Sequence, residues 1–110
     1  MAFDIETVNN SVLGYVADVR NDMPIDRVFL FGSHAKGTAT EQSDVDLCFF
    51  SESFENRRSV DIIARLLGLT HKYTDIFIEP HAFPTSELES DNPLIKEIIR
   101  TGREIMPDLQ

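Results

Sequence analysis

The chain has 110 residues, the size of one ordinary domain, so we expect a single domain over residues 1–110. Hydrophobic residues make up 42% of it and eight residues are Phe, which provides for a folded core and excludes a disordered chain. Ten basic and 19 acidic residues give a net charge of −9, and so acidic a surface argues against non-specific binding of DNA or RNA.

The first half of the chain predicts one helix and two strands. Apolar residues recur at helical spacing over residues 4–21, which predicts an amphipathic helix. The run RVFLF at Arg27–Phe31 predicts a short buried strand, and Gly32 ends it. A polar stretch follows over 33–43, and the run DVDLCFF predicts the next strand over 44–50.

The second half begins with a helix predicted over residues 54–67. Four apolar residues are expected to face the core from this helix: Val60, Ile63, Leu66 and Leu67. The alternating run TDIFIE then predicts a third strand over 74–79, which Pro80 is expected to stop.

A final helix is predicted over residues 93–101, capped by Asn92 or Asp91 and ended by Gly102. The order is therefore helix, strand, polar turn, strand, helix, strand and helix. This order predicts an α/β domain, or α+β, with a small mixed β-sheet and helices packed mainly on one face.

Cys48 is the only cysteine, so no disulfide can form within the chain. It lies in the apolar stretch Val45–Phe50, and we interpret it as a small buried hydrophobic residue and not as a catalytic thiol. The sequence contains neither a signal peptide nor an apolar segment of membrane-spanning length. We therefore expect a soluble, cytoplasmic protein that does not bind a membrane.

The stretch FLFGSHAKGTATEQSDVDLCFF, residues 29–50, carries the chemistry. Gly32 ends a strand and lets the backbone approach a phosphate closely, and Ser33 offers a hydroxyl and an N–H group. If the next residues wind into a helical turn, its first N–H groups also face the anion. Lys36 adds a charge that can face a phosphate. A Gly-Ser pair by itself, however, is most often an ordinary turn.

Asp44 and Asp46 lie two residues apart on a predicted strand, so their side chains point to the same face. Two adjacent carboxylates repel unless one is protonated or both share a cation. Mg²⁺ suits such a pair, because it takes oxygen ligands and is commonly held by one or two carboxylates together with substrate phosphates. The alternative for the pair alone is an acidic strand end without a metal.

Asp75 opens the third predicted strand and is a conditional third carboxylate. If that strand pairs beside 44–50, Asp75 can reach the same face and take part in a two-metal displacement at phosphorus. Taken alone, Asp75 is interpreted as a charge at a strand end.

These residues together resemble a known family. Gly-Ser, a ten-residue gap, Asp-X-Asp and a later strand Asp form the motif of the DNA polymerase β-like nucleotidyltransferase superfamily, which has a palm-like fold. The string GSHAKGTATEQSDVDL is similar to its small prokaryotic branch, the minimal nucleotidyltransferases or MNT domains.

The resemblance implies a role for each matching residue. Gly32 and Ser33 would hold the triphosphate, and Asp44 and Asp46 the metal, with Asp75 as the third catalytic and metal-binding carboxylate. Lys36 stands where the family more often has Arg, which keeps the charge but loses bidentate phosphate contact. We assign no catalytic role to the histidines: His34 occupies a variable position, and His71 and His81 are interpreted as surface or capping residues.

The resemblance also implies a partner and a reaction. Members of this branch commonly act as the antitoxin of a helical HEPN-domain toxin and are proposed to transfer AMP from ATP, with Mg²⁺, to a tyrosine of that toxin. Two alternatives remain: a catalytically inactive nucleotide-binding module that neutralises its partner by binding, and a small-molecule (antibiotic) nucleotidyltransferase.

Overall fold

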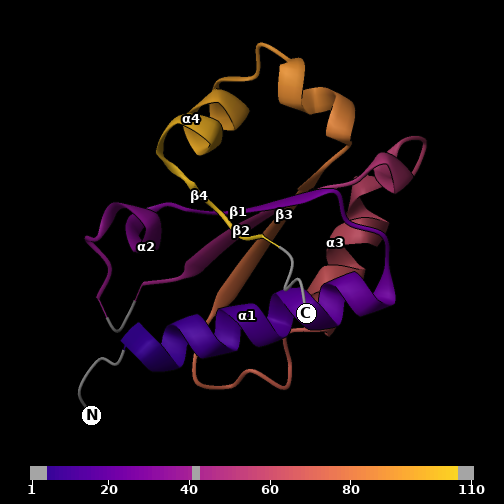
Figure 1. Cartoon of the computed structure of the whole chain (residues 1–110). Coiled ribbons are helices and arrows are strands. Elements are labelled where there is room, and N and C mark those ends of the chain that lie inside the picture. Colours follow the sequence, from indigo (N-terminus) through magenta and orange to yellow (C-terminus); the bar gives the residue numbers. More distant parts are fainter. Residues whose placement is uncertain (1–4, 41–42, 107–110) are drawn as a thin grey trace.

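The computed structural model describes residues 5–40 and 43–106, with side chains from Val8 onward. Its centre is a four-stranded mixed sheet with the strand order β3-β2-β1-β4 (Figure 1). The second strand in the chain is antiparallel to the first and parallel to the third, and the short fourth strand is antiparallel to the first. The strands are β1 (Arg27–Phe31), β2 (Val45–Phe50), β3 (Ile78–Phe83) and β4 (Arg103–Glu104).

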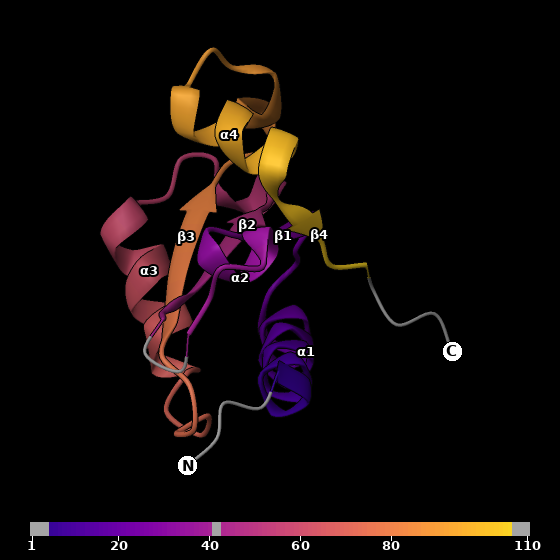
Figure 2. The same ribbon diagram turned by 90° about the vertical axis from the view of Figure 1, so that its left-hand side faces the viewer.

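Helices cover both faces of this sheet, two on one face and one on the other. The helical elements are α1 (Ile5–Asp22), α2 (Ser33–Lys36), η1 (Glu52–Phe54), α3 (Ser59–Gly68), η2 (Thr85–Glu89) and α4 (Pro93–Thr101). Figure 2 shows α4 lying away from both α1 and α3. Within the described part of the chain, no helix has the length and apolar character needed to cross a membrane.

Two hydrophobic clusters fix these positions. The larger one lies between α1, α3 and one sheet face and includes Tyr15, whose hydroxyl donates a 2.8 Å hydrogen bond to the Leu66 carbonyl. The smaller one joins α4 to the other face through Phe29, Phe50, Ile95 and Ile98, together with Cys48. Side chains along β2 alternate between the two faces of the sheet. Asp46 therefore lies on the same face as Cys48 and Phe50, the face that α4 covers, and it is near the start of β2 whereas Phe50 ends the strand.

The predicted fold class is confirmed, and four predicted elements agree with the structure. The strands over 27–31 and 44–50 and the helix over 93–101 are found to within one residue at each end. The helix over 4–21 ends within one residue of its predicted end, and its predicted first residue, Asp4, lies outside the described residues. Asn92 caps the last helix, since its side-chain oxygen accepts a 2.9 Å hydrogen bond from the Leu94 N–H.

The helix predicted over 54–67 begins too early. Asn56 has a φ of 63°, which interrupts a helix, and Arg58 is extended, so helix α3 starts at Ser59. The predicted inner face is also rotated: Val60 and Leu67 are 59% and 48% exposed. The residues that α3 buries are Ile62 and Leu66.

The third strand is displaced by four residues from its predicted position. The prediction was 74–79, whereas β3 spans Ile78–Phe83 with Pro80 inside it. Pro80 does not stop the strand because β3 is an edge strand, where the absence of an N–H group on the outer side costs no sheet hydrogen bond. As a result Asp75 lies before the strand, and Glu79 takes the position beside Asp46.

Candidate functional site

The Gly32 turn connects β1 to a short helix. Gly32 has φ 75° and ψ −152°, and its carbonyl accepts hydrogen bonds from the N–H groups of Ala35 and Lys36, each at 3.1 Å. The predicted helical turn after Gly32 is therefore present. Because intrahelical bonds begin at Ala35, the helix itself supplies no acceptor for the N–H of Ser33.

Gly32 is also in close contact with the aspartate of the neighbouring strand. A Cβ atom at this position would lie 2.5 Å from Asp46 Oδ2, closer than any real carbon–oxygen contact. Phe31 and Asp46 are direct partners in the β1–β2 register, which explains the contact. Glycine is thus required twice, by its positive φ and by the space that the carboxylate occupies. The turn and Asp46 belong to one site.

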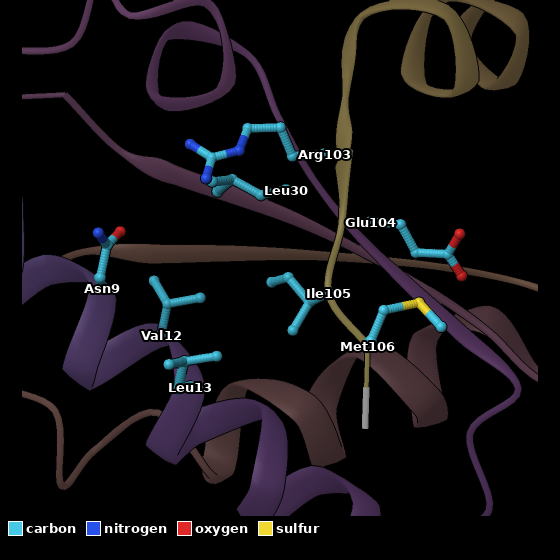
Figure 3. Close-up of a pocket in the computed structure, with 8 residues that line it drawn as sticks. All are labelled: Asn9, Val12, Leu13, Leu30, Arg103, Glu104, Ile105 and Met106. Carbon is cyan, nitrogen blue, oxygen red and sulfur yellow. The ribbon is translucent and has the colours of Figure 1, made fainter. Parts of the chain in front are cut away.

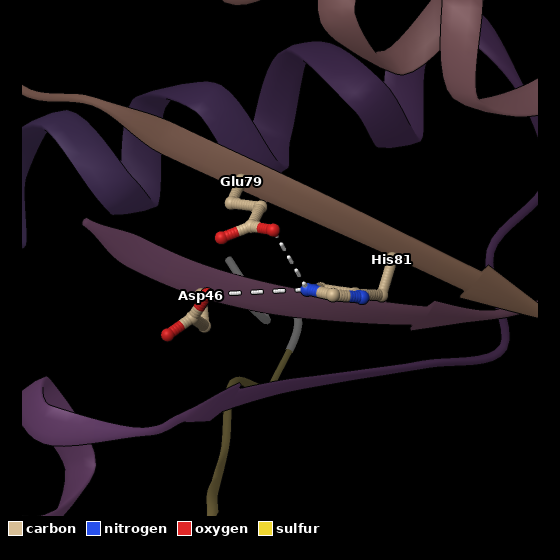
Figure 4. Close-up of side chains that lie close together, drawn as sticks. All are labelled: Asp46, Glu79 and His81. Carbon is tan, nitrogen blue, oxygen red and sulfur yellow. Dashed lines mark ion pairs between the residues drawn. The ribbon is translucent and has the colours of Figure 1, made fainter. Parts of the chain in front are cut away.

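Three side chains gather at the end of β2 and β3: Asp46, Glu79 and His81 (Figure 4). The parallel register sets Asp46 opposite Glu79 and Cys48 opposite His81, so all three side chains share one face. One potential ligand atom from each lies within 4.8 Å of the other two. His81 Nε2 is 3.9 Å from Asp46 Oδ1 and 3.9 Å from Glu79 Oε1.

An unpaired nitrogen and two neighbouring carboxylates make this cluster suitable for binding a cation. His81 Nε2 is buried and has no hydrogen-bond partner, and 3.9 Å is too long for a hydrogen bond to either carboxylate. Burial raises the pKa of Asp46 to about 6, with further contributions from hydrogen bonding to Glu79 and from the charges of Glu79 and Asp44. A divalent ion would offset both the repulsion and the buried unpaired nitrogen. The three side chains therefore fit a divalent cation.

Asp44 and Asp75 lie outside this three-residue cluster. Asp44 is exposed, directly before β2, and its charge acts on Asp46. Asp75 lies in the turn before β3, where its two carboxylate oxygens accept from the Ser11 hydroxyl of α1 at 2.9 and 3.2 Å. The structure does not bring Asp75 to Asp46, because the strand starts later than predicted; Glu79 stands there instead.

Lys36 and the other two histidines have structural contacts. Lys36 Nζ is 3.6 Å from Glu97 Oε1 of α4, so in this conformation its charge is paired within the protein. His71 contacts the Gly68 carbonyl at the end of α3, which agrees with a capping role. His34 is buried, with Nε2 3.4 Å from the Ser43 carbonyl.

Glu79 and His81 are the site residues that the sequence did not reveal. They repeat, in the run IEPH, the i and i+2 spacing of Asp44 and Asp46, which is the signal that could have found them. Pro80 lies between them, and a proline normally indicates the end of a strand.

Cys48 is excluded as a nucleophile, as the sequence indicated. The thiol is fully buried in the smaller hydrophobic cluster, and burial raises its pKa to about 12. It therefore stays protonated at neutral pH and acts as a small apolar residue.

A cavity of about 320 Å³ lies elsewhere, between α1 and the residues of and after β4 (Figure 3). It is bounded by Val12 and Leu13 on α1, by Leu30, and by Ile105 and Met106. None of the residues that line it belongs to the Gly32 turn or to the Asp46 cluster. Asn9, Arg103 and Glu104 add polar groups to its lining.

Comparisons with known proteins match most of the chain. Residues 12–105 match the nucleotidyltransferase domain family. A Methanocaldococcus jannaschii protein provisionally named a protein adenylyltransferase is 37% identical over 91 residues, which cover 74% of this chain and 57% of that protein. This chain thus aligns with little more than half the length of that relative.

Solved structures share the fold at low identity. A Sulfolobus solfataricus crystal structure, provisionally described as a nucleotidyltransferase, superposes with a TM-score of 0.64 at 17% identity, over 91% of this chain and 83% of that one. A toxin–antitoxin crystal structure with AMP-PNP superposes with a TM-score of 0.62 at 17% identity, over 90% and 73% of the two chains.

Proposed function

The chain belongs to the nucleotidyltransferase domain family, and from this premise we propose that it is a Mg²⁺-dependent enzyme that transfers AMP from ATP to a hydroxyl of a partner protein. The observation that carries the proposal is the contact between Gly32 and Asp46. It sets the Gly32 turn directly against a carboxylate of the Asp46, Glu79 and His81 cluster, which could hold a cation. Neither half would support nucleotide chemistry by itself.

The residues divide the work between the phosphates and the cation. Gly32 and Ser33 would bind the triphosphate through an N–H group of the turn and the Ser33 hydroxyl. Asp46 and Glu79 would hold Mg²⁺, with Asp44 adding negative charge beside them. Lys36 would reach the phosphates by leaving Glu97, a half-exposed pair that costs little to break.

The reaction forms one bond at the α-phosphorus and breaks another. The partner's hydroxyl oxygen attacks that phosphorus, pyrophosphate leaves, and the hydroxyl proton passes to a carboxylate of the site or to water. The bound cation supplies charge neutralisation on the phosphate oxygens. The carboxylates keep it in place and orient the triphosphate.

The choice of a protein acceptor rests on two relatives. One is named, provisionally, a protein adenylyltransferase, and a structure with the same fold is a toxin–antitoxin with an ATP analogue. We propose accordingly that the chain is the antitoxin of a toxin–antitoxin pair, with a HEPN-domain toxin as acceptor. The net charge of −9 suits a basic, RNA-cleaving partner.

Labelling of the protein encoded beside this one tests the proposal. Incubation with ATP labelled in the α-phosphate and Mg²⁺ should label that partner with the wild type and not with Asp46→Asn. Equal labelling of the partner by the wild type and by Asp46→Asn would show that Asp46 is not part of the catalytic site. If Asp46→Asn fails to label but still neutralises the partner in cells, the protein acts by binding, as the inactive-module alternative states. Labelling of an antibiotic in place of the protein would indicate the small-molecule alternative.

A further inference from the structure

His81 is the one member of the cluster that a phosphate-transfer site built on carboxylates does not require. Its ring is fixed by packing: it stacks edge-on against Phe31 with the ring centres 5.1 Å apart, and its side chain is 29% exposed. The pairing of His81 with Cys48 in the β2–β3 register fixes the position of its backbone. The nitrogen Nε2 is therefore held in place toward Asp46 and Glu79 (Figure 4).

The distances between His81 Nε2 and the carboxylate oxygens of Asp46 and Glu79 leave space between the three groups. Nε2 stands 3.9 Å from one oxygen of each carboxylate and makes no hydrogen bond. Two neighbouring ligands of one metal ion, each about 2.1 Å from it, lie about 3.0 to 3.4 Å apart. The observed separations are somewhat wider, so a bound ion would draw the three donor atoms closer together.

We propose that His81 Nε2 is a direct ligand of the cation held by Asp46 and Glu79, and that this nitrogen makes the site prefer Mn²⁺ and other transition-metal ions over Mg²⁺. This rests on the proposed function for the use of the cation, but the metal site itself is defined by the side chains alone. Mg²⁺ would still support the reaction, bound through the carboxylates and the phosphates.

The preference follows from the donor set. Carboxylate and water suit Mg²⁺, whereas imidazole suits the later divalent ions, whose affinity for nitrogen rises along the first transition series. A neutral imidazole also leaves the charge of the set at −2 when both carboxylates are ionised, which one divalent ion neutralises. Removal of the nitrogen should weaken Mn²⁺ binding and leave Mg²⁺ binding nearly unchanged.

The test uses Mn²⁺ alone, without nucleotide. Free Mn²⁺ is counted from its electron paramagnetic resonance signal, and Mg²⁺ affinity is obtained by competition. Pulsed resonance of the bound ion detects the ¹⁴N nucleus of a directly coordinated imidazole. The variants are His81→Phe, which keeps a ring against Phe31, and His71→Phe as the matched control at the exposed end of α3.

We expect a directly bound ¹⁴N in the wild type and in His71→Phe, and none in His81→Phe. The Mn²⁺ affinity of His81→Phe should fall by about 10- to 100-fold, as for the loss of a ligand or its support, while the Mg²⁺ affinity changes by less than about threefold because Mg²⁺ relies on carboxylates.

Bound Mn²⁺ without ¹⁴N coupling in the wild type would overturn the proposal, as would an absence of Mn²⁺ binding or equal losses for the two ions. The wild-type spectrum decides the matter even if His81→Phe does not fold. Coordination by His81 without transfer of AMP would contradict the proposed function alone, and transfer without coordination would contradict this inference alone.

Discussion

Replacement of Asp46 by Asn should stabilise the metal-free protein at pH 7 while abolishing its activity. Folding raises the pKa of Asp46 from 3.8 to about 6, chiefly through burial and then through Glu79 and Asp44. A carboxyl whose pKa is higher in the folded state than in the unfolded state lowers the free energy of unfolding once both states ionise. The penalty is absent below pH 3.8, grows between pH 3.8 and about 6, and is complete at pH 7.

The size of the effect follows from the shift. A shift of about two pKa units corresponds to about 3 kcal/mol at full strength. Solvent screening around a side chain that is 23% exposed, at the open end of the sheet, reduces the effect to about 1–2 kcal/mol. The variant should therefore exceed the wild type by about 1–2 kcal/mol in the free energy of unfolding at pH 7, and by much less near pH 4.

Urea denaturation with EDTA at pH 7 and at pH 4 measures this difference. Asp44→Asn is the matched control, since Asp44 is exposed and makes the smallest contribution to the Asp46 shift. Addition of a divalent cation at 100 times its dissociation constant should stabilise the wild type by about 2.7 kcal/mol and Asp46→Asn by much less. An Asp46→Asn variant that is less stable than the wild type in EDTA at pH 7 would refute the reasoning.

Three further substitutions test other parts of the account. Gly32→Ala should lose cation binding and about 1–3 kcal/mol of stability in urea denaturation, because its φ is positive and its Cβ would collide with the Asp46 carboxylate. Gly37→Ala is the control: Gly37 has a similar φ but open space around it, so this variant should retain cation binding. Glu79→Gln should weaken Mn²⁺ binding at least about tenfold, whereas Asp75→Asn should leave it unchanged in the same titration; the reverse order would restore Asp75 to the site. Leu66→Ala should cost about 2–5 kcal/mol in the free energy of unfolding, since Leu66 is fully buried, and a loss below about 1 kcal/mol would contradict the packing of α3.

Much of the fold and half of the site could be predicted because local signals agreed with the tertiary structure. The helical periodicity of α1 and the apolar runs of β1 and β2 point to the same core that the structure forms. Gly32 and Asp46 could be joined in advance, because a short connection between two antiparallel strands brings their ends together.

The remainder depended on information that the sequence carries only weakly. The alternation of apolar residues in TDIFIE (74–79) continues into IEPHAF (78–83). The local sequence does not indicate which of these two segments pairs with β2. The parallel register is set by the long-range packing of β3 against α3 and β2. A shift of that register replaces Asp75 by Glu79 and brings in His81, because every side chain on the strand changes its partner. In α3, the left-handed Asn56 delayed the helix start in the same unforeseen way.

Transfer of label from two forms of ATP tests the central claim most directly. The wild type is incubated with its partner, Mg²⁺ and ATP labelled in either the α- or the γ-phosphate, and the label on protein is counted. The account predicts that the α-label is transferred to the partner and that the γ-label leaves as pyrophosphate. Transfer of the γ-label, or of neither label with an intact cation site, would contradict it.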